Sequence, residues 1–573
     1  MSRFWSNNWV KAIAINLVIL VVAYLLADTV YETNDDYVIS LRMVDGYPYS
    51  TFVNFFLCKI VIGLQSVMPG VNAFVVLQIA LSWICFVLIT RTFLESFENR
   101  AFLVIAILIL TVFAGDHYCI MQFTKSAAIA LTTGFLLLMD AMIRKRSAGI
   151  YVAAFILIYL GTWMRAMNLI AAIGFAGIFL IAWVLTHRKE LIPGGYLKGR
   201  RIAVYVVCLV FVAGAAGTYV MSMHINNSTP ELQAFNEYDA QRSLVTDYPI
   251  YENYEKGADA YEAAGLDRND LFLINCWYLD YDGAASLDNL KTINKIYNET
   301  GKAEVSYSEA ARSFLDGARE DMTNFTRRGM HLVILWLLLI CGILLYRPRV
   351  WIYIACMGAL ACALYVYLYY VGRPLYRASY IADMSAIIWI LYFMGGEDVR
   401  KGLQKPDSKG IKGIQVMLCM LCAAFVMMCQ MPIQNAYTQL HDFAQKGQMS
   451  EQMSAFLTEN EDNFYVFANG TRGQSPYYAD PLTVPEPNYQ KNALGFGSWG
   501  TGSPYLIEKL NRYDLNNTFG DLIDNPKAFV FEDKHVKQLA AYFNKWYEDD
   551  GTITLEHVDN IAGHDLWRVK RIQ

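Results

Sequence analysis

Residues 12–37 read AIAINLVILVVAYLLADTVYETNDDY, an apolar run that is followed at once by an acidic segment. The apolar part, from about Ala12 to Leu26, is longer than a signal-peptide core and lacks a convincing cleavage site. It therefore predicts a retained first transmembrane helix. The acidic part then lies just outside a membrane and carries the adjacent carboxylates of Asp35 and Asp36.

The composition points to a polytopic membrane protein. Of the 573 residues, 55% are hydrophobic and only 17% are charged, and the mean hydropathy is +0.27. A soluble chain of this size is less apolar. Nothing in the charge pattern indicates a nucleic-acid partner. The eleven cysteines are scattered, mostly within apolar runs, and show no metal-binding spacing.

Apolar stretches of membrane-spanning length indicate about eleven transmembrane helices. The predicted spans are 10–28, 71–94, 101–115, 126–142, 150–164, 167–186, 202–223, 329–346, 350–371, 376–395 and 413–430.

The distribution of basic residues sets the predicted orientation. We interpret 52–68 as an interfacial helix that does not cross the membrane. All the basic loops then fall on the same side of the membrane as the N-terminus; these loops lie near 91–100, 144–146, 188–201, 347–349 and 400–412. The positive-inside rule makes that side the cytoplasm. The localisation we expect is a bacterial plasma membrane, with the N-terminus cytoplasmic and the C-terminal domain extracytoplasmic.

Two domains are expected. Residues 1–430 would form the all-α transmembrane bundle, with a first outer loop at 29–70 that holds interfacial helices and a large extracytoplasmic loop at 224–328. Residues 431–573 would form an extracytoplasmic α/β domain, because strand, helix and hairpin patterns follow one another there. Those patterns are Phe464–Phe467, Ala528–Phe531, 535–547, 552–558 and 566–572.

The acidic pair has two interpretations. Neighbouring carboxylates repel each other, which raises one pKa and makes Asp35 or Asp36 a candidate general base. In the alternative, Asn34 or Asp35 merely caps a helix that begins at Tyr37.

Several cations stand at the predicted outer ends of spans, where the positive-inside rule disfavours them. A buried cation is costly unless it is paired or snorkels, so the set predicts an anionic ligand such as a lipid phosphate. Singly, each could snorkel, and Arg377 could instead pair with Asp383. The predicted ligands are Lys125, Arg165, Arg373, Arg377 and Tyr376, with Asp116, His117 and Asn168 as accessory residues.

The arrangement resembles the GT-C class of integral-membrane glycosyltransferases. The resemblance covers roughly residues 1–190 and rests on the acidic pair after the first span, on Val44-Asp45-Gly46-Tyr47-Pro48, on Thr124-Lys125 and on Arg165-Ala166-Met167-Asn168. An external α/β domain after the last span adds to it. The chain departs from the family at Tyr49-Ser50-Thr51-Phe52, where a His-Pro or Pro-Pro is frequent, and at Ser126, where many members have Asp.

The resemblance implies transfer of a sugar from a polyprenyl-phosphate carrier to a glycan, lipid or protein acceptor. Asp35 or Asp36 would be the base, while Lys125, Arg165, Arg373 and Arg377 would hold the leaving phosphate. No nucleotide is needed outside the cell, and a divalent metal such as Mg or Mn between Asp35, Asp36 and Asp116 is an open alternative. Membrane lipids are the other expected partners.

Three other functions compete with this interpretation. A polymerase or ligase of lipid-linked polysaccharide would also gather outer arginines. A transporter or flippase ranks lower, because no internal repeat is evident. A non-catalytic membrane scaffold is the remaining alternative.

Overall fold

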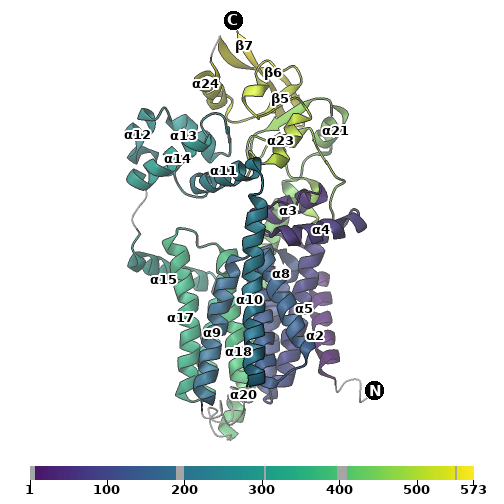
Figure 1. The fold of residues 1–573 in the computed structure, drawn as a ribbon, viewed down its shortest axis with the longest axis vertical. Coiled ribbons are helices and arrows are strands. Elements are labelled where there is room, and N and C mark those ends of the chain that lie inside the picture. Colours follow the sequence, from purple (N-terminus) through teal and green to yellow (C-terminus); the bar gives the residue numbers. More distant parts are fainter. Residues whose placement is uncertain (1–6, 189–198, 302–304, 397–408, 549–550, 573) are drawn as a thin grey trace. The chain divides into compact units, whose positions relative to one another are not determined.

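The structure is a computed structural model that describes residues 7–188, 199–301, 305–396, 409–548 and 551–572 (Figure 1). It divides into two compact units. Unit 1 comprises Met1–Met223, Val305–Phe443 and Asp480–Val484, and unit 2 comprises His224–Glu304, Ala444–Ala479 and Pro485–Gln573. The expected boundary after residue 430 differs from this division, because unit 1 continues to Phe443 and the greater part of the 224–328 segment, His224–Glu304, belongs with the C-terminal residues.

Unit 1 is a helical bundle. Ten helices within the described ranges are long and apolar enough to cross a membrane, which indicates a multi-pass membrane protein. They are α2 (Asn8–Leu26), α5 (Ala73–Ser96), α6 (Arg100–Cys119), α7 (Phe123–Arg144), α9 (Met167–His187), α10 (Gly199–Asn226), α16 (Arg327–Leu345), α17 (Pro348–Tyr370), α18 (Tyr376–Gly395) and α20 (Lys409–Lys446).

A further apolar helix, α8 (Ala148–Met164), has 17 residues and corresponds to the expected span at 150–164. The ten long helices and α8 together match the expected count of about eleven. Parts of two basic loops on which the orientation rests, 189–198 and 397–408, lie outside the described residues, as does Arg3. The orientation therefore stays a prediction.

Helices α7 and α18 form the centre of the bundle. Nearly all of α18 from Ser379 onward is buried, as is α7 from Phe123 to Ala141. Glycine allows α7 and α8 to approach closely, because a Cβ added at Gly134 would lie 2.7 Å from Ile158 Cγ1 and 3.0 Å from the Ala154 carbonyl oxygen. A polar pair also joins α7 to α18, since the hydroxyls of Thr132 and Ser385 are 2.7 Å apart.

The first outer loop contains two short helices. Helix α4 (Phe55–Val67) covers the predicted 52–68 segment and has 13 residues. It rises about 20 Å, which is too short for a hydrocarbon core of about 30 Å. Helix α3 (Asn34–Val44) begins three residues earlier than the alternative at Tyr37 assumed, and its N-cap is Thr33, so Asp35 and Asp36 lie in its first turn.

Two element ends differ from the sequence-based expectation. The segment 115–125 was expected to be a loop, but α6 continues to Cys119 and places Asp116 and His117 in its last turn. Tyr376 and Arg377 open α18, which has the bounds expected for the span 376–395. Helix α20 has 38 residues, with Pro432 inside it, and extends well beyond the predicted end at 430.

Unit 2 contains a five-stranded sheet in the order β4-β3-β5-β7-β6, which confirms the expected C-terminal strands. The strands are β3 (Phe464–Phe467), β4 (Ala493–Gly495), β5 (Ala528–Phe531), β6 (Thr552–Ile561) and β7 (His564–Ile572). Strand β3 pairs in parallel with β4 and β5, while β7 runs antiparallel to β5 and β6. Strands β3 and β5 are fully buried apolar runs, as parallel strands usually are.

Helices from both parts of the chain complete unit 2. They are α11 (Pro230–Thr246), η1 (Tyr251–Lys256), α12 (Ala258–Ala263), α13 (Arg268–Asn275), α14 (Leu287–Ile296), η2 (Tyr297–Gly301), α21 (Glu451–Glu459), α22 (Pro476–Ala479), α23 (Pro504–Asn511), η3 (Gly520–Leu522) and α24 (Val536–Tyr547). In contrast, α15 (Tyr307–Thr323) belongs to unit 1 and packs on α16 and α17.

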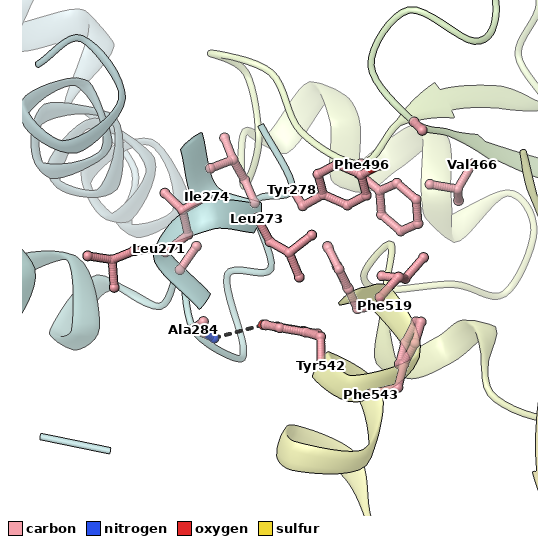
Figure 2. Packing of buried hydrophobic residues seen from close by; sticks show 14 of the residues in the cluster. Leu271, Leu273, Ile274, Tyr278, Ala284, Val466, Phe496, Phe519, Tyr542 and Phe543 are labelled. Carbon is pink, nitrogen blue, oxygen red and sulfur yellow. Dashed lines mark hydrogen bonds between the residues drawn. The ribbon is translucent and has the colours of Figure 1, made fainter. Parts of the chain in front are cut away.

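One hydrophobic core joins the two parts of unit 2. Figure 2 shows Leu273 and Tyr278 facing Phe496, Phe519 and other buried residues of the C-terminal segment. The Ala284 backbone N–H donates to the hydroxyl of Tyr542 at 2.9 Å. This shared core is the physical reason why 224–304 folds with the C-terminal residues and not with the bundle.

Candidate functional site

A short parallel pairing brings the first outer loop to the junction of α6 and α7. In it, β1 (Val30–Tyr31) lies against β2 (Ile120–Met121), and the Glu32 backbone N–H donates to the Met121 carbonyl oxygen at 2.9 Å. The acidic residues after β1 are thereby held beside Asp116 and Lys125. Residues some ninety positions apart in sequence thus form one site.

Four charged side chains of unit 1 form a closed ring of ion pairs. Lys125 Nζ lies 2.9 Å from Asp116 Oδ2 and 3.4 Å from Glu32 Oε2. Arg327 lies 3.0 Å from Asp116 Oδ1 and 3.3 Å from Glu32 Oε1. The hydroxyl of Tyr376 donates to Asp116 at 3.3 Å, and its ring lies 4.3 Å from the Arg327 guanidinium. We call Glu32, Asp116, Lys125 and Arg327 the ion-pair ring.

The ion-pair ring has no net charge and is almost completely buried from solvent. Two carboxylates face two cations, and both Lys125 and Asp116 are 0% exposed. Buried charges are tolerated when they are paired and hydrogen-bonded in this way. Because Lys125 is already neutralised by carboxylates, the geometry favours a positioning role for it. Its predicted contact with a lipid phosphate stays a prediction.

Sequence reasoning missed Glu32 and Arg327. A usable signal existed for Arg327, since Arg327-Arg328 opens a span on the side predicted to be outside, where cations are disfavoured. Glu32 gave no such signal, because an acidic residue in an outer loop is ordinary.

Asp36 anchors the start of α3 to two helices of the bundle. It is 0% exposed, and its Oδ1 accepts hydrogen bonds from Gln78 Nε2 at 3.0 Å and from the Phe123 backbone N–H at 2.9 Å. Burial raises the pKa of Asp36 to about 7, and the negative charge of Asp35 adds to this, whereas the two hydrogen bonds oppose it. Near neutral pH this carboxyl is therefore close to half protonated.

Asp35 lies in a more accessible position than Asp36. Its carboxylate is 3.5 Å from the Arg377 guanidinium, and the two side chains are 17% and 27% exposed. The alternative pairing of Arg377 with Asp383 is not what the structure shows. Asp383 is instead hydrogen-bonded by the Tyr365 hydroxyl at 2.5 Å and lies 3.4 Å from His331 Nδ1.

A second arginine joins this pair from the loop between α8 and α9. The Arg165 guanidinium lies 5.6 Å from the ring centre of Phe52 and 5.9 Å from that of Phe123. Burial lowers the pKa of Arg165, and so do the positive charges of Arg377 and Arg373, while Asp35 opposes the shift. The positive charges of Arg377 and Arg373 thus act on Arg165, and the negative charge of Asp35 opposes them there. We call Arg165, Arg373 and Arg377 the arginine cluster.

A cavity of about 360 Å³ opens between α16, α18, α20 and the first outer loop. Its wall includes Glu32 and Arg327 of the ion-pair ring, and Arg377 of the arginine cluster. Its size is at the lower end of the range for small-molecule sites. The complete lining is Glu32, Thr33, Arg327, Leu375, Tyr376, Arg377, Ala436, Gln439 and Leu440.

The accessory residues have structural contacts. The Asn168 side-chain amide donates to the Thr124 carbonyl oxygen at 2.9 Å and so ties the start of α9 to that of α7. His117 is buried, with Nδ1 3.2 Å from Ser82 Oγ. Within the described ranges, no three His, Cys, Asp or Glu side chains come together in a way that could hold a metal ion.

Comparisons with protein-family models, with curated proteins and with solved structures find no match. The ten apolar helices and the buried charge network therefore define the class, a multi-pass membrane protein, and the geometry of the site carries the functional argument.

Proposed function

We propose that this protein is a membrane glycosyltransferase that moves a sugar from a polyprenyl-phosphate carrier to an extracytoplasmic acceptor. The observation that carries the proposal is the ion pair of Asp35 with Arg377, a residue that lines the cavity and whose positive charge also acts on Arg165. A base and an anion site side by side are what transfer from a phosphate-linked donor requires.

In this proposal Asp35 is the general base. Its carboxylate takes the proton of an acceptor hydroxyl while the hydroxyl oxygen attacks the anomeric carbon of the donor sugar. The bond between that carbon and the phosphate oxygen breaks, and the phosphate leaves with the electron pair. The arginine cluster stabilises the negative charge that develops, because a guanidinium group can bind phosphate oxygens in a bidentate fork.

Asp36 is then a positioning residue. It is fully buried and its hydrogen bonds fix the first turn of α3, which carries Asp35. A partly protonated Asp36 also places less negative charge next to Asp35 than an ionised one would. The ion-pair ring fixes the part of the cavity wall that Glu32 and Arg327 form.

The proposal places the site on the outer face of a bacterial plasma membrane. The acceptor would be a cell-wall or surface glycopolymer, a lipid or a protein. Polymerisation or ligation of a lipid-linked polysaccharide is the nearest alternative, since the arginine cluster would also suit a pyrophosphate carrier. The mass of the carrier released in an assay separates these two functions.

Release of polyprenyl phosphate from a panel of polyprenyl-phosphate hexoses and pentoses tests the proposal with purified full-length protein. We expect Asp35→Asn to lower the rate at least about 100-fold at every pH, the usual contribution of a general base. Asp28→Asn is the matched control, since it removes the charge of an exposed residue in the same loop and should leave the rate unchanged.

The same assay distinguishes the role of Asp35 from that of Asp36. Because the pKa of Asp36 is about 7, this residue is mostly neutral at pH 6, and Asp36→Asn should then stay within about threefold of the wild type, since only hydrogen-bond geometry changes. At pH 8 the two proteins should diverge. A wild type that turns over no donor of the panel, or an Asp35→Asn variant of full activity, would contradict the proposed function.

A further inference from the structure

A short segment from the C-terminal half of the chain forms part of unit 1. Asp480–Val484 belongs to the bundle, although the residues on both sides of it belong to unit 2. It lies along the linker between α4 and α5, where Val71 and Thr483 form an isolated antiparallel bridge. Backbone hydrogen bonds on either side of this bridge join the segment to Asn72 at 2.8 Å and to Gly70 at 3.1 Å. We call Asp480–Val484 the strap.

The sequence of the strap favours the conformation in which it docks. The Asp480 carboxylate accepts hydrogen bonds from the Leu482 backbone N–H at 3.3 Å and from the Thr483 hydroxyl at 3.1 Å, which stabilises a turn at the start of the strap. Pro481 and Pro485 each restrict the residue before them to extended backbone conformations. Because the strap has few other conformations to lose, its docking costs little conformational entropy.

The linker that receives the strap is also held in shape by its own contacts. Gly70 has a φ of +76°, a left-handed conformation that glycine adopts without strain. The Gln65 side chain spans the turn, because Nε2 donates to the carbonyl oxygens of Met68 and Val71 at 3.1 and 2.9 Å, and Oε1 accepts from the Ala73 backbone N–H at 3.0 Å. Two backbone edges of fixed shape therefore meet, as in strand addition, where main-chain hydrogen bonds supply the affinity.

Tyr31 connects the strap to the candidate site. Its hydroxyl donates to the Pro481 carbonyl oxygen at 3.4 Å and accepts from Asn72 Nδ2 at 2.9 Å. Tyr31 is 2% exposed and is the last residue of β1. Glu32 of the ion-pair ring follows it directly, and Asp35 lies four residues further on, in the first turn of α3. Because so few rotatable backbone bonds separate these residues, a displacement of Tyr31 shifts both carboxylates.

We infer that the strap is a positioning element of the candidate site: it holds Tyr31 and β1, and so sets the position of Asp35 relative to Arg377. The strap acts through Tyr31, whereas Asp35 is the group that contacts the substrate in the proposed reaction. The inference rests on the proposed function for the reaction that is affected, and adds that a segment of the C-terminal half of the chain shapes the site. A catalytic group displaced by about 1 Å can lose about 100-fold in rate, so loss of a strap contact should lower kcat.

Disulfide crosslinking of the full-length protein in mild detergent tests whether the strap is docked. Val71 and Thr483 face each other as a pair without mutual hydrogen bonds, and the Cα atoms of such a pair lie about 4.5 Å apart, within reach of a disulfide. We expect Val71→Cys/Thr483→Cys to crosslink under mild oxidation, as located by peptide mass spectrometry. Ile60→Cys/Thr483→Cys is the matched control, because Ile60 is an exposed residue of α4 about 10 Å along the helix from its end. Equal yields from the two pairs would overturn the inference.

The effect of the strap on the site is tested with Tyr31→Phe, which removes the hydroxyl and keeps the buried ring. Hydrogen exchange of the Glu32 amide, which donates to the Met121 carbonyl oxygen, should become at least about tenfold faster, because β1 opens more often. In sugar transfer kcat should fall at least about tenfold, while the KM for the donor stays within about threefold of the wild type.

Tyr307→Phe is the matched control for both measurements, because Tyr307 is a tyrosine of unit 1 that is 65% exposed. Its exchange rate at Glu32 and its kcat should equal those of the wild type. Unchanged exchange in Tyr31→Phe, or a higher KM with an unchanged kcat, would contradict the positioning role.

The strap and the proposed function can fail independently. If the wild type turns over no sugar donor while the crosslink forms and Tyr31→Phe speeds exchange at Glu32, the glycosyltransferase is rejected and the strap is kept as the element that positions β1. If sugar transfer occurs and Tyr31→Phe leaves kcat unchanged, the positioning role is rejected and the enzyme is kept.

Discussion

Replacing Lys125 by methionine tests whether the ion-pair ring holds the outer end of the bundle together. The substitution keeps most of the side-chain volume and removes one charge, so Asp116 and Glu32 are left with Arg327 as the remaining cation of the ring. The Lys125 and Asp116 side chains are 1% and 0% exposed, so solvent screens little of the change. Removing one partner of a buried pair typically costs about 3–5 kcal/mol.

Thermal unfolding of the detergent-solubilised protein, followed by tryptophan fluorescence, measures this cost. At roughly 2 °C per kcal/mol for a large chain, the midpoint should fall by about 6–10 °C. Lys59→Met is the control, because Lys59 is an exposed lysine of α4, and its midpoint should stay within about 1 °C of the wild type since surface charges contribute little.

The double variant Asp116→Asn/Lys125→Met provides the decisive comparison. It removes one charge of each sign and leaves Glu32 paired with Arg327, so most of the lost stability should return. Refutation would be a Lys125→Met protein that unfolds at the wild-type temperature, or a double variant that unfolds no higher than Lys125→Met alone. Either result would mean that the ring geometry does not carry the stability assigned to it.

Two further predictions concern packing and pH. Gly134→Ala should destabilise the bundle by about 1–3 kcal/mol, because its Cβ would meet Ile158; Gly149→Ala, with open space around it, should be near neutral in the same unfolding assay. In unit 2, burial raises the pKa of Asp280 from 3.8 to about 6, against hydrogen bonds from Tyr547 and Tyr542. The folded protein therefore favours the protonated form of Asp280. The free energy of unfolding keeps this contribution in full below pH 4 and falls by about 3 kcal/mol as the pH rises through 6. Asp280→Asn should remove that pH dependence of the unfolding midpoint, and an unchanged profile would exclude Asp280 as its source.

The spans and the C-terminal strands were predictable because their signals are local. A helix long and apolar enough to cross a membrane is visible in any window of about twenty residues. The runs Phe464–Phe467 and Ala528–Phe531 are continuous buried strands of the parallel part of the sheet. Element ends were less predictable, since Asp116 and His117 at the end of α6 look like loop residues.

The division into units was not predictable in the same way. The helices of 224–304 are joined in sequence to the bundle, yet their apolar faces are buried against residues more than two hundred positions later, such as Phe519 and Tyr542. An amphipathic pattern shows that a face will be buried and does not show which partner buries it.

The multi-spanning character of this membrane protein and the unusual placement of Asp35, Asp36 and the outer cations follow from local sequence alone, because the cost of charge near lipid is a property of each residue and its neighbours. The contacts of these residues depend on the tertiary fold. It pairs Lys125 with Asp116 and Glu32, leaves Asp35 accessible beside Arg377 and buries Asp36. Pairing and burial depend on which distant segments meet, and the short β1–β2 contact that makes them meet involves only two residues of each strand.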